Sequence, residues 1–442
     1  MAPRELPRRP NLEHLRNEAR DLQRREGGKL TAAQHAVARS YGFPSWPKLK
    51  AHVELWDEWF RPPDQVEASS AVDRFLTLAC NGIPGLAEAA ALFDAHPELL
   101  DDAYVRAAVG SPDAEPMPPG GPFRWEPLLY AAYARLPGRS SLPAIEALLA
   151  AGADPNAGYL WDGGSVFTAV TGVLGGGEDW PNWPAHPEWA AAARLLLEAG
   201  ADPNDLQSVY NRMFLPDDEP YELLFSYGLG RGVRPGPWPA RLGARAWPKE
   251  DALALALHWA AAHGMTARVR LLLAHGVRPD ADPHHGNVHT SPVEAAQRAG
   301  HGEVVAVLVA AGAEPVELDP AEQFAAACMA GDRAEVEATR TDELVEAVGS
   351  LGLLAEAAKL GKAEAVRVML LAGFDVDACH GATAIHWAAW WGHLDIVRLL
   401  VGWGADTTIE DDEFHGTPLG WAEHANQHAV AEYLRFAVTP PS

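Results

Sequence analysis

Hydrophobic positions along the chain recur in one short pattern: a cluster of aliphatic residues, then alanine and glycine, then Asp, Asn or Pro. The pattern occurs as LLAAGADPN (148–156), LLLEAGADPN (195–204), LLLAHGVRPD (271–280), LVAAGAEP (308–315), MLLAGFDVD (369–377) and LLVGWGADTT (399–408). The aliphatic cluster is typical of the buried side of a helix, and glycine favours the left-handed conformation that ends one. Asp, Asn and Pro suit the turn that follows. Each copy therefore predicts the end of a helix.

A second apolar helix is predicted before several copies of this pattern. Its clearest examples are SPVEAAQRAGH (291–301), TAIHWAAWWGH (383–393) and TPLGWAEHA (417–425), each of which begins with a Ser or Thr that can cap a helix. The glycines of the aliphatic pattern lie 48, 76, 36, 61 and 31 residues apart. These intervals fit one or two units of about 33 residues, some with insertions. Each unit is predicted to be a helix, a turn, a second helix and an extended finger.

These residues resemble the ankyrin-repeat signature, Thr-Pro-Leu-His-x-Ala-Ala-x-x-Gly-His, which repeats about every 33 residues. We count about ten units between roughly residues 70 and 438, of which 383–408 is nearest to the signature and four are degenerate. The resemblance implies an all-α solenoid of stacked helix pairs over about 66–438, with little or no strand. It also implies a non-catalytic scaffold that binds a partner protein or peptide.

Residues 1–62 have a different pattern, which predicts three short helices at about 11–26, 31–41 and 46–59. The stretch YGFPSWPKLKAHV (41–53) resembles part of a helical segment that often precedes ankyrin arrays in bacterial proteins. One interpretation is a polar helical cap, because the ends of a solenoid need polar surfaces. The other is a separate recognition module.

Two stretches rich in Pro and Gly interrupt the predicted array, at residues 110–122 and 175–187. Pro and Gly at this density exclude regular helix or strand. The second stretch lies between the two helices of one unit and contains Trp180 and Trp183, with Trp189 shortly after it. Loops of this length are often lids or binding elements, but a loop that simply packs on the array explains the pattern equally well.

The chain has 442 residues and a formal net charge of −25 at pH 7. Residues 1–62 carry 12 Lys and Arg against 8 Asp and Glu, whereas the rest of the chain carries 23 against 52. An acidic array repels phosphate, so we expect neither nucleic acid nor a membrane surface as partner. Cys80, Cys328 and Cys379 form no CxxC pair, and no stretch has the length of a membrane span. We therefore expect a cytoplasmic monomer.

The helix predicted at 383–393 has three tryptophans on one side. Trp387, Trp390 and Trp391 fall within an arc of about 100°, since each helical residue turns the chain by roughly that angle. The apolar residues Ile385, Ala388 and Ala389 make a separate surface on which another helix can pack. The indoles are thus predicted to face away from that packing.

The ankyrin resemblance implies that the signature helices line a concave groove. By the family positions, its lining would be Tyr130, Tyr133, Asn211, Phe214, Trp259, His263, Ala295, Arg298, Ala326, Met329, Glu356, Lys359, Trp387, Trp390, Trp391, Trp421 and His424. Rows of Trp and Tyr are typical binding anchors. On this view Trp390 and Trp391 are partly accessible and Trp387 is more covered. The alternative is that the N-terminal helices, the inserted loop or tight curvature cover the aromatic residues.

No motif for nucleophilic catalysis, phosphate binding or zinc binding occurs, and no cofactor or metal is predicted. The stretch DADPHHGNVH (280–289) does contain side chains that could bind a metal, Asp282, His284, His285 and His289. It also occupies a finger position, where these residue types suit a turn. His258 and His386 occupy the signature histidine position, for which the resemblance implies a hydrogen bond to the adjacent turn.

Arg212 occupies a position that normally holds a small buried alanine. A guanidinium there needs an acidic partner, for which the sequence offers Asp217, Asp218, Glu219 and Glu222. Alternatively, Asn211 and Arg212 bind a small hydrophobic or anionic ligand under the 175–189 loop, with Phe214, Trp259 and His263 nearby. In that case the chain is a small-molecule binder or an unconventional enzyme. Under both alternatives the 175–187 loop is predicted to fold over the groove near Phe214 and Trp259.

Overall fold

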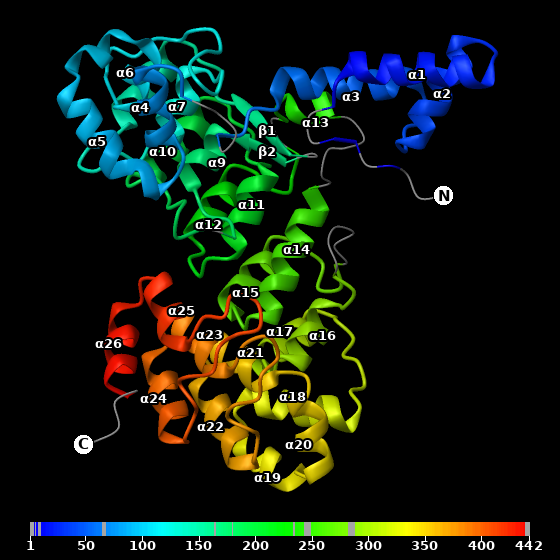
Figure 1. The fold of residues 1–442 in the computed structure, drawn as a ribbon, viewed down its shortest axis with the longest axis vertical. Coiled ribbons are helices and arrows are strands. Elements are labelled where there is room, and N and C mark those ends of the chain that lie inside the picture. Colours follow the sequence, from blue (N-terminus) through cyan, green and yellow to red (C-terminus); the bar gives the residue numbers. More distant parts are fainter. Residues whose placement is uncertain are drawn as a thin grey trace. The chain divides into compact units, whose positions relative to one another are not determined.

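The fold is given by a computed structural model, which describes residues 4, 6–7, 10–63, 68–162, 165–178, 180–232, 235–242, 249–281 and 288–437. This part of the chain is helical apart from one two-stranded sheet, which confirms the predicted all-α repeat class (Figure 1). Two compact units are present, unit 1 (Met1–Ala256) and unit 2 (Leu257–Ser442). No helix within the described ranges is long and apolar enough to cross a membrane.

Unit 1 begins with three helices at the positions that the sequence predicts, α1 (Leu12–Glu26), α2 (Leu30–Ser40) and α3 (Trp46–Trp59). Helix α1 starts where the Asn11 side chain accepts hydrogen bonds from the N–H groups of Glu13 and His14. The three helices share a small core, which consists of Leu15, Ala19, Val37, Ala38, Tyr41, Leu49 and Val53.

The rest of unit 1 consists of helix pairs and one hairpin. The elements are α4 (Ala71–Cys80), α5 (Leu86–Ala95), α6 (Ala103–Ala108), α7 (Pro127–Tyr133), α8 (Leu142–Ala150), β1 (Gly158–Asp162), β2 (Ser165–Thr168), α9 (Ala169–Leu174), α10 (Trp189–Glu198), α11 (Leu206–Met213), α12 (Glu219–Ser226) and α13 (Trp238–Leu242), with short 3₁₀ helices at Ile83–Gly85 and Pro97–Asp101. Helices α4, α7, α9 and α11 pack on one another in chain order. Helix α14 (Lys249–Ala262) contains the boundary between the units.

The hairpin of β1 and β2 has two different faces, because successive residues of a strand point to opposite sides. Tyr159 pairs with Phe167, and Leu160 pairs with Val166 in the next register position. Leu160 and Val166 belong to a cluster at the end of α3 and on α13 that also contains Trp56, Phe60, Trp238 and Leu242. The N-terminal helices are therefore attached to the array through one face of the hairpin.

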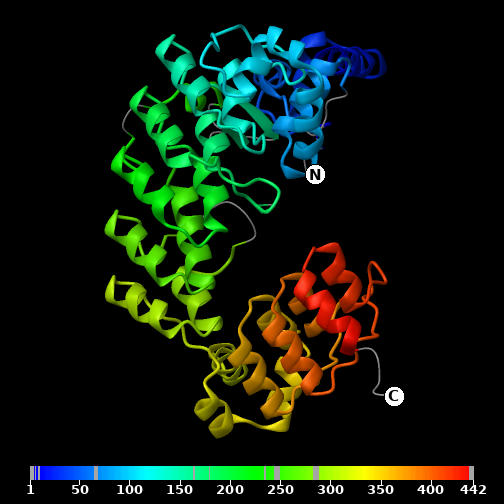
Figure 2. The same ribbon diagram turned by 90° about the vertical axis from the view of Figure 1, so that its left-hand side faces the viewer.

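Unit 2 is a stack of helix pairs (Figure 2). Its elements after α14 are α15 (Thr266–Ala274), α16 (Pro292–Arg298), α17 (Gly302–Ala310), α18 (Pro320–Ala330), α19 (Arg333–Thr339), α20 (Asp342–Gly349), α21 (Leu353–Lys359), α22 (Ala363–Ala372), α23 (Ala384–Trp390), α24 (Leu394–Gly402), α25 (Pro418–His424) and α26 (His428–Ala437). Helices α16, α18, α21, α23 and α25 form one row in chain order, and α22, α24 and α26 form another. Each repeat therefore buries its apolar side against its neighbours.

The repeated aliphatic pattern ends helices as predicted. Gly373 follows α22 with a φ of 99° in the left-handed region, and its N–H donates to the Leu370 carbonyl at 3.1 Å. Glycine adopts this conformation without the steric clash that a Cβ atom would cause.

The signature histidines bind the neighbouring turn, which confirms their predicted role. His386 is buried on α23; its Nε2 lies 3.0 Å from the Gly416 carbonyl, and its Nδ1 lies 2.8 Å from the Thr383 hydroxyl. Nε2 of His258 lies 3.0 Å from the Thr290 hydroxyl. Since the Thr383 N–H also donates to Nδ1 of His386, Nε2 carries the proton of a neutral ring.

Lowering the pH from 7 to 5 is expected to lower the free energy of unfolding of unit 2. Burial lowers the pKa of His386, against the opposing effect of the Gly416 carbonyl. Below about pH 6.5 the unfolded chain therefore binds a proton that the folded chain does not. The contribution of neutral His386 to the free energy of unfolding is therefore complete above that pH. It decreases as the pH falls, by up to about 2 kcal/mol at pH 5.

Urea denaturation at both pH values measures this change, and the comparison is between the wild type and His386→Gln. We expect the variant to be less stable at pH 7 and less sensitive to pH. An unchanged pH dependence in the variant would show that His386 is not the group responsible.

Candidate binding sites

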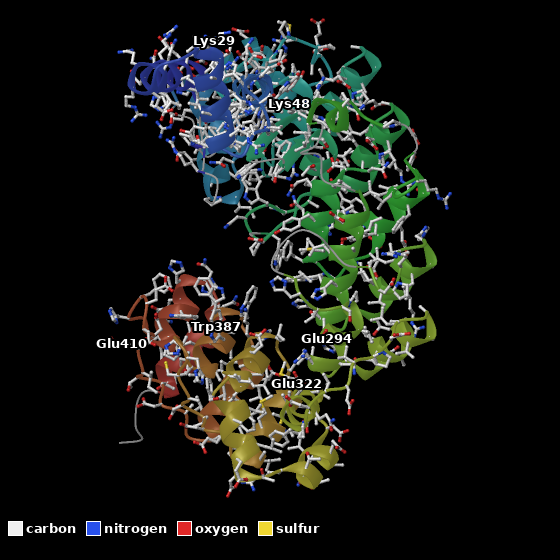
Figure 3. All side chains as sticks on the ribbon, turned by 90° about the vertical axis from the view of Figure 1, so that its right-hand side faces the viewer. Lys29, Lys48, Glu294, Glu322, Trp387 and Glu410 are labelled. Carbon is white, nitrogen blue, oxygen red and sulfur yellow. The ribbon has the colours of Figure 1, made fainter. Side chains whose placement is uncertain are left out.

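Two neighbouring helices of unit 2 bring four aromatic side chains together. Trp387 and Trp390 on α23 each make an edge-on contact with Trp421 on α25, with ring centroids 5.2 and 5.6 Å apart. Trp390 also stacks on His424 at 5.5 Å. We call Trp387, Trp390, Trp391, Trp421 and His424 the aromatic face of unit 2; Trp387 is labelled in Figure 3.

The aromatic face is partly open to solvent. Trp390 is half-buried and Trp391 is 43% exposed, which confirms the partial accessibility predicted for both. Trp387 is half-buried as well, whereas Ile385 and Ala389 on the same helix are fully buried. Helix α23 thus places its aliphatic side in the core and its indoles at the surface.

Asp411 fixes the orientation of the Trp421 ring. Its carboxylate accepts a hydrogen bond from the indole N–H at 2.8 Å and others from the N–H groups of Phe414 and Gly416 at 2.6 and 2.8 Å. Burial alone would raise the pKa of the Asp411 carboxyl, but these hydrogen bonds outweigh it and hold the pKa well below its usual range. Next to this group, the Lys359 ammonium lies 5.1 Å from the centroid of the Trp387 ring.

The other groove residues predicted in unit 2 make separate local contacts. Trp259 and His263 on and just after α14 stack at 3.9 Å, and His263 Nδ1 lies 2.8 Å from the Trp259 carbonyl. Arg298 forms ion pairs with Glu294 on α16 and Glu322 on α18, and both acids are labelled in Figure 3. Arg298 thus joins two adjacent repeats.

Unit 1 contains a pocket of about 400 Å³ beside the loop that follows α9. Its aromatic lining consists of Tyr133, Tyr159, Trp161, Phe167, Trp183 and Tyr210, and its polar lining includes Arg135, Thr171, Glu178, Gln207 and Asn211. Two of the predicted groove residues, Tyr133 and Asn211, therefore belong to it. Tyr130 is instead buried in the core, where its hydroxyl donates to the Gly120 carbonyl at 2.8 Å.

The 175–187 loop folds back onto α11. The N–H of Gly177 donates to the Asn211 carbonyl at 2.9 Å, and the N–H of Gly176 donates to the Trp183 carbonyl at 2.7 Å. Phe214, three residues after Asn211, is half-buried and contacts the Tyr210 ring edge-on at 5.3 Å. In unit 1 the loop thus closes one side of the pocket, next to Asn211.

Arg212 pairs with Asp217, one of the four acidic partners predicted for it. The guanidinium is buried, binds both carboxylate oxygens of Asp217 and donates to the Leu174 carbonyl at 3.1 Å. It joins the end of α9 to the segment after α11. Arg212 is not part of the pocket lining.

Arg135 is a pocket residue that sequence reasoning missed. It follows α7, and its guanidinium donates to four main-chain carbonyls: Ala132 at 2.8 Å, Ala134 at 2.9 Å, Pro184 at 3.1 Å, and Gly172. The signal was a basic residue just after an apolar helix, where the last carbonyls need donors. Trp161 and Phe167 were missed because the hairpin that carries them was not predicted.

Within the described ranges, no group of three His, Cys, Asp or Glu residues is arranged to hold a metal ion. Asp282, His284 and His285, considered above as metal ligands, lie outside those ranges.

Residues 341–411 match the family model of ankyrin repeats over three copies. The matched region includes α21 to α24 and therefore Trp387, Trp390 and Trp391. The chain thus carries ankyrin repeats, which generally mediate interactions between proteins. No curated protein matches the chain.

Proposed function

We propose that the protein is a non-catalytic scaffold and that the aromatic face of unit 2 binds a segment of a partner protein. The observation that carries this proposal is the adjacency of Trp387, Trp390 and Trp421 on consecutive repeats, with Trp391 43% exposed beside them. Partly accessible Trp side chains that are already held in place by neighbours are the usual anchors of protein interfaces.

The charge of unit 2 favours a basic partner segment. Residues 257–442 carry 11 Lys and Arg against 26 Asp and Glu, a net charge of −15. Such a surface attracts cationic chains and repels acidic ones. The partner segment should therefore combine an apolar side chain, which packs on the indoles, with flanking Lys or Arg.

Photo-crosslinking from position 391 tests this proposal in the full-length protein. Benzoylphenylalanine in place of Trp391 should capture a specific peptide in cells, and a synthetic copy of that peptide can be titrated into the purified protein by calorimetry. We expect Trp390→Ala to weaken its binding about 30-fold, because a central Trp anchor contributes about 2 kcal/mol or more. Higher salt should weaken it further.

Trp403→Ala is the matched control, since Trp403 is 44% exposed and lies outside the aromatic face. This control should bind the peptide as the wild type does. Equal affinities of the wild type and Trp390→Ala, with circular dichroism showing both folded, would refute the proposal.

A further inference from the structure

Arg135 brings an uncompensated positive charge to the pocket of unit 1. Its four hydrogen bonds go to neutral carbonyls, and within the described ranges no carboxylate forms an ion pair with it. Burial lowers the pKa of the guanidinium to about 10, which still leaves it charged at neutral pH. Arg135 is half-buried, and a partly desolvated charge without a counter-charge is unfavourable, so an anion bound nearby would stabilise it.

The same pocket also has an aromatic lining. Trp161 lies 5.1 Å from Phe167 and makes an edge-on contact with Trp183 at 6.3 Å. Trp161 and Trp183 are both half-buried, so part of each ring remains accessible, whereas Tyr133 and Tyr159, which also line the pocket, are buried. Accessible indoles beside buried aromatic rings form a surface on which a planar ring can stack.

At two glycines the backbone of the pocket wall lies very close to neighbouring residues. A Cβ atom at Gly172 would lie 2.6 Å from the Tyr133 ring, and one at Gly176 would lie 2.7 Å from the Asn211 carbonyl oxygen. Neither position therefore tolerates a larger residue without movement of the wall. The volume of about 400 Å³ falls in the range of small-molecule sites.

We propose that this pocket binds a small planar aromatic acid, whose ring packs on Trp161 and Trp183 and whose carboxylate lies beside Arg135. The site is separate from the aromatic face of unit 2 and does not depend on the function proposed for that face.

An aromatic-lined pocket could also suit an organic cation, and Glu178 is an acidic lining residue. Glu178 is exposed, however, and its carboxylate accepts a hydrogen bond from the Tyr210 hydroxyl at 2.5 Å. Arg135 is the more enclosed of the two charges and would repel a cation. The charge of the pocket thus favours the acid.

Calorimetric titration of the full-length protein with 2-naphthoate and with its neutral isostere 2-naphthamide tests the proposal. We expect 2-naphthoate to bind with a Kd below about 1 mM and 2-naphthamide to bind at least about tenfold more weakly, because only the acid compensates Arg135. Hydrogen exchange should slow in β1, β2 and the 175–187 loop when 2-naphthoate binds.

Two variants locate the site. Trp161→Ala should weaken the binding of both compounds about tenfold or more. Arg135→Gln should make the acid and the amide bind equally. If Arg135→Gln unfolds because it loses its carbonyl contacts, Trp161→Ala still decides the location. Trp403→Ala in unit 2 is the control and should bind 2-naphthoate as the wild type does.

Three results would each overturn the proposal: no binding of 2-naphthoate at about 5 mM, roughly five times the upper limit expected for its Kd; equal affinity of the wild type for acid and amide; or unchanged binding in folded Trp161→Ala. Tighter binding of 2-naphthylmethylammonium than of 2-naphthoate would assign the pocket to cations instead.

Discussion

Replacement of Trp125 by alanine is expected to destabilise unit 1 by about 3–5 kcal/mol, the range for removing a large buried aromatic side chain. Trp125 is 1% exposed and lies at the centre of an aromatic cluster. Its ring centroid is 4.5 Å from that of Phe123, 4.6 Å from Tyr159 and 5.2 Å from Tyr133. Its indole N–H also donates to the Arg61 carbonyl at 3.2 Å, a bond that alanine cannot replace.

Amide hydrogen exchange measures the destabilisation by Trp125→Ala separately for each helix and strand. Protection should fall in α7 and β1 and remain unchanged in α23 to α25, because stability in repeat arrays depends on nearest neighbours. Trp180→Ala is the control, since Trp180 is 41% exposed in the same unit, and it should change exchange little. A Trp125→Ala protein with normal protection in α7 would show that the aromatic cluster does not stabilise this unit.

Replacement of Arg212 by alanine is expected to destabilise unit 1 by about 2–4 kcal/mol, since it removes a buried charge-assisted pair and leaves a cavity. The guanidinium is 6% exposed, whereas the Asp217 carboxylate is 38% exposed and stays hydrated when left alone. For that reason the expected loss lies at the lower end for broken buried pairs. The lost bond to the Leu174 carbonyl adds to it.

Urea denaturation followed by circular dichroism gives the change for Arg212→Ala. Arg333→Ala is the matched control, because Arg333 also pairs with a carboxylate, that of Glu337, but both side chains are 62% exposed. An exposed pair contributes little to stability, so this control should unfold as the wild type does. If both variants lost the same free energy of unfolding, burial would not explain how much the Arg212–Asp217 pair contributes to stability.

Helices with local signals could be predicted from the sequence. The bounds of α1, α2 and α3 agree with the predicted ranges to within one residue, because apolar spacing and capping residues act over short distances. The same holds for α23, where Thr383 and His386 mark the start and Ile385 and Ala389 mark the buried side. The family resemblance added the role of His386, which no local rule supplies.

The pocket could not be predicted, because its contacts join distant parts of the chain. Arg135 binds Gly172 and Pro184, which lie 37 and 49 residues further along. No local propensity encodes such a contact. The hairpin did have a local signal, since GYLWDGGSVFT (158–168) places Asp-Gly-Gly between aromatic and aliphatic residues. The repeat pattern, which assigns this stretch to a finger, hid that signal.

For Arg212 the sequence predicted the kind of contact but not its geometry. An arginine at a buried repeat position required an acid, and four candidates followed within ten residues. The turn after α11 places Asp217, one of these four, against the guanidinium. That placement depends on the direction of the chain after Phe214, which the degenerate repeat does not reveal.

The two faces of the β1–β2 hairpin link the N-terminal helices to the pocket. Tyr159, Trp161 and Phe167 line the pocket, while Leu160 and Val166 pack in the cluster at the end of α3. A strand pair this short cannot shift one face without shifting the other. Ligand affinity and the packing of α3 on the hairpin should therefore be thermodynamically coupled. The coupling must be reciprocal: if the packing of α3 raises ligand affinity by a given factor, ligand binding favours that packing by the same factor. In an array of this kind, a change in the packing of the first helices can thus change ligand affinity at a site formed by later repeats.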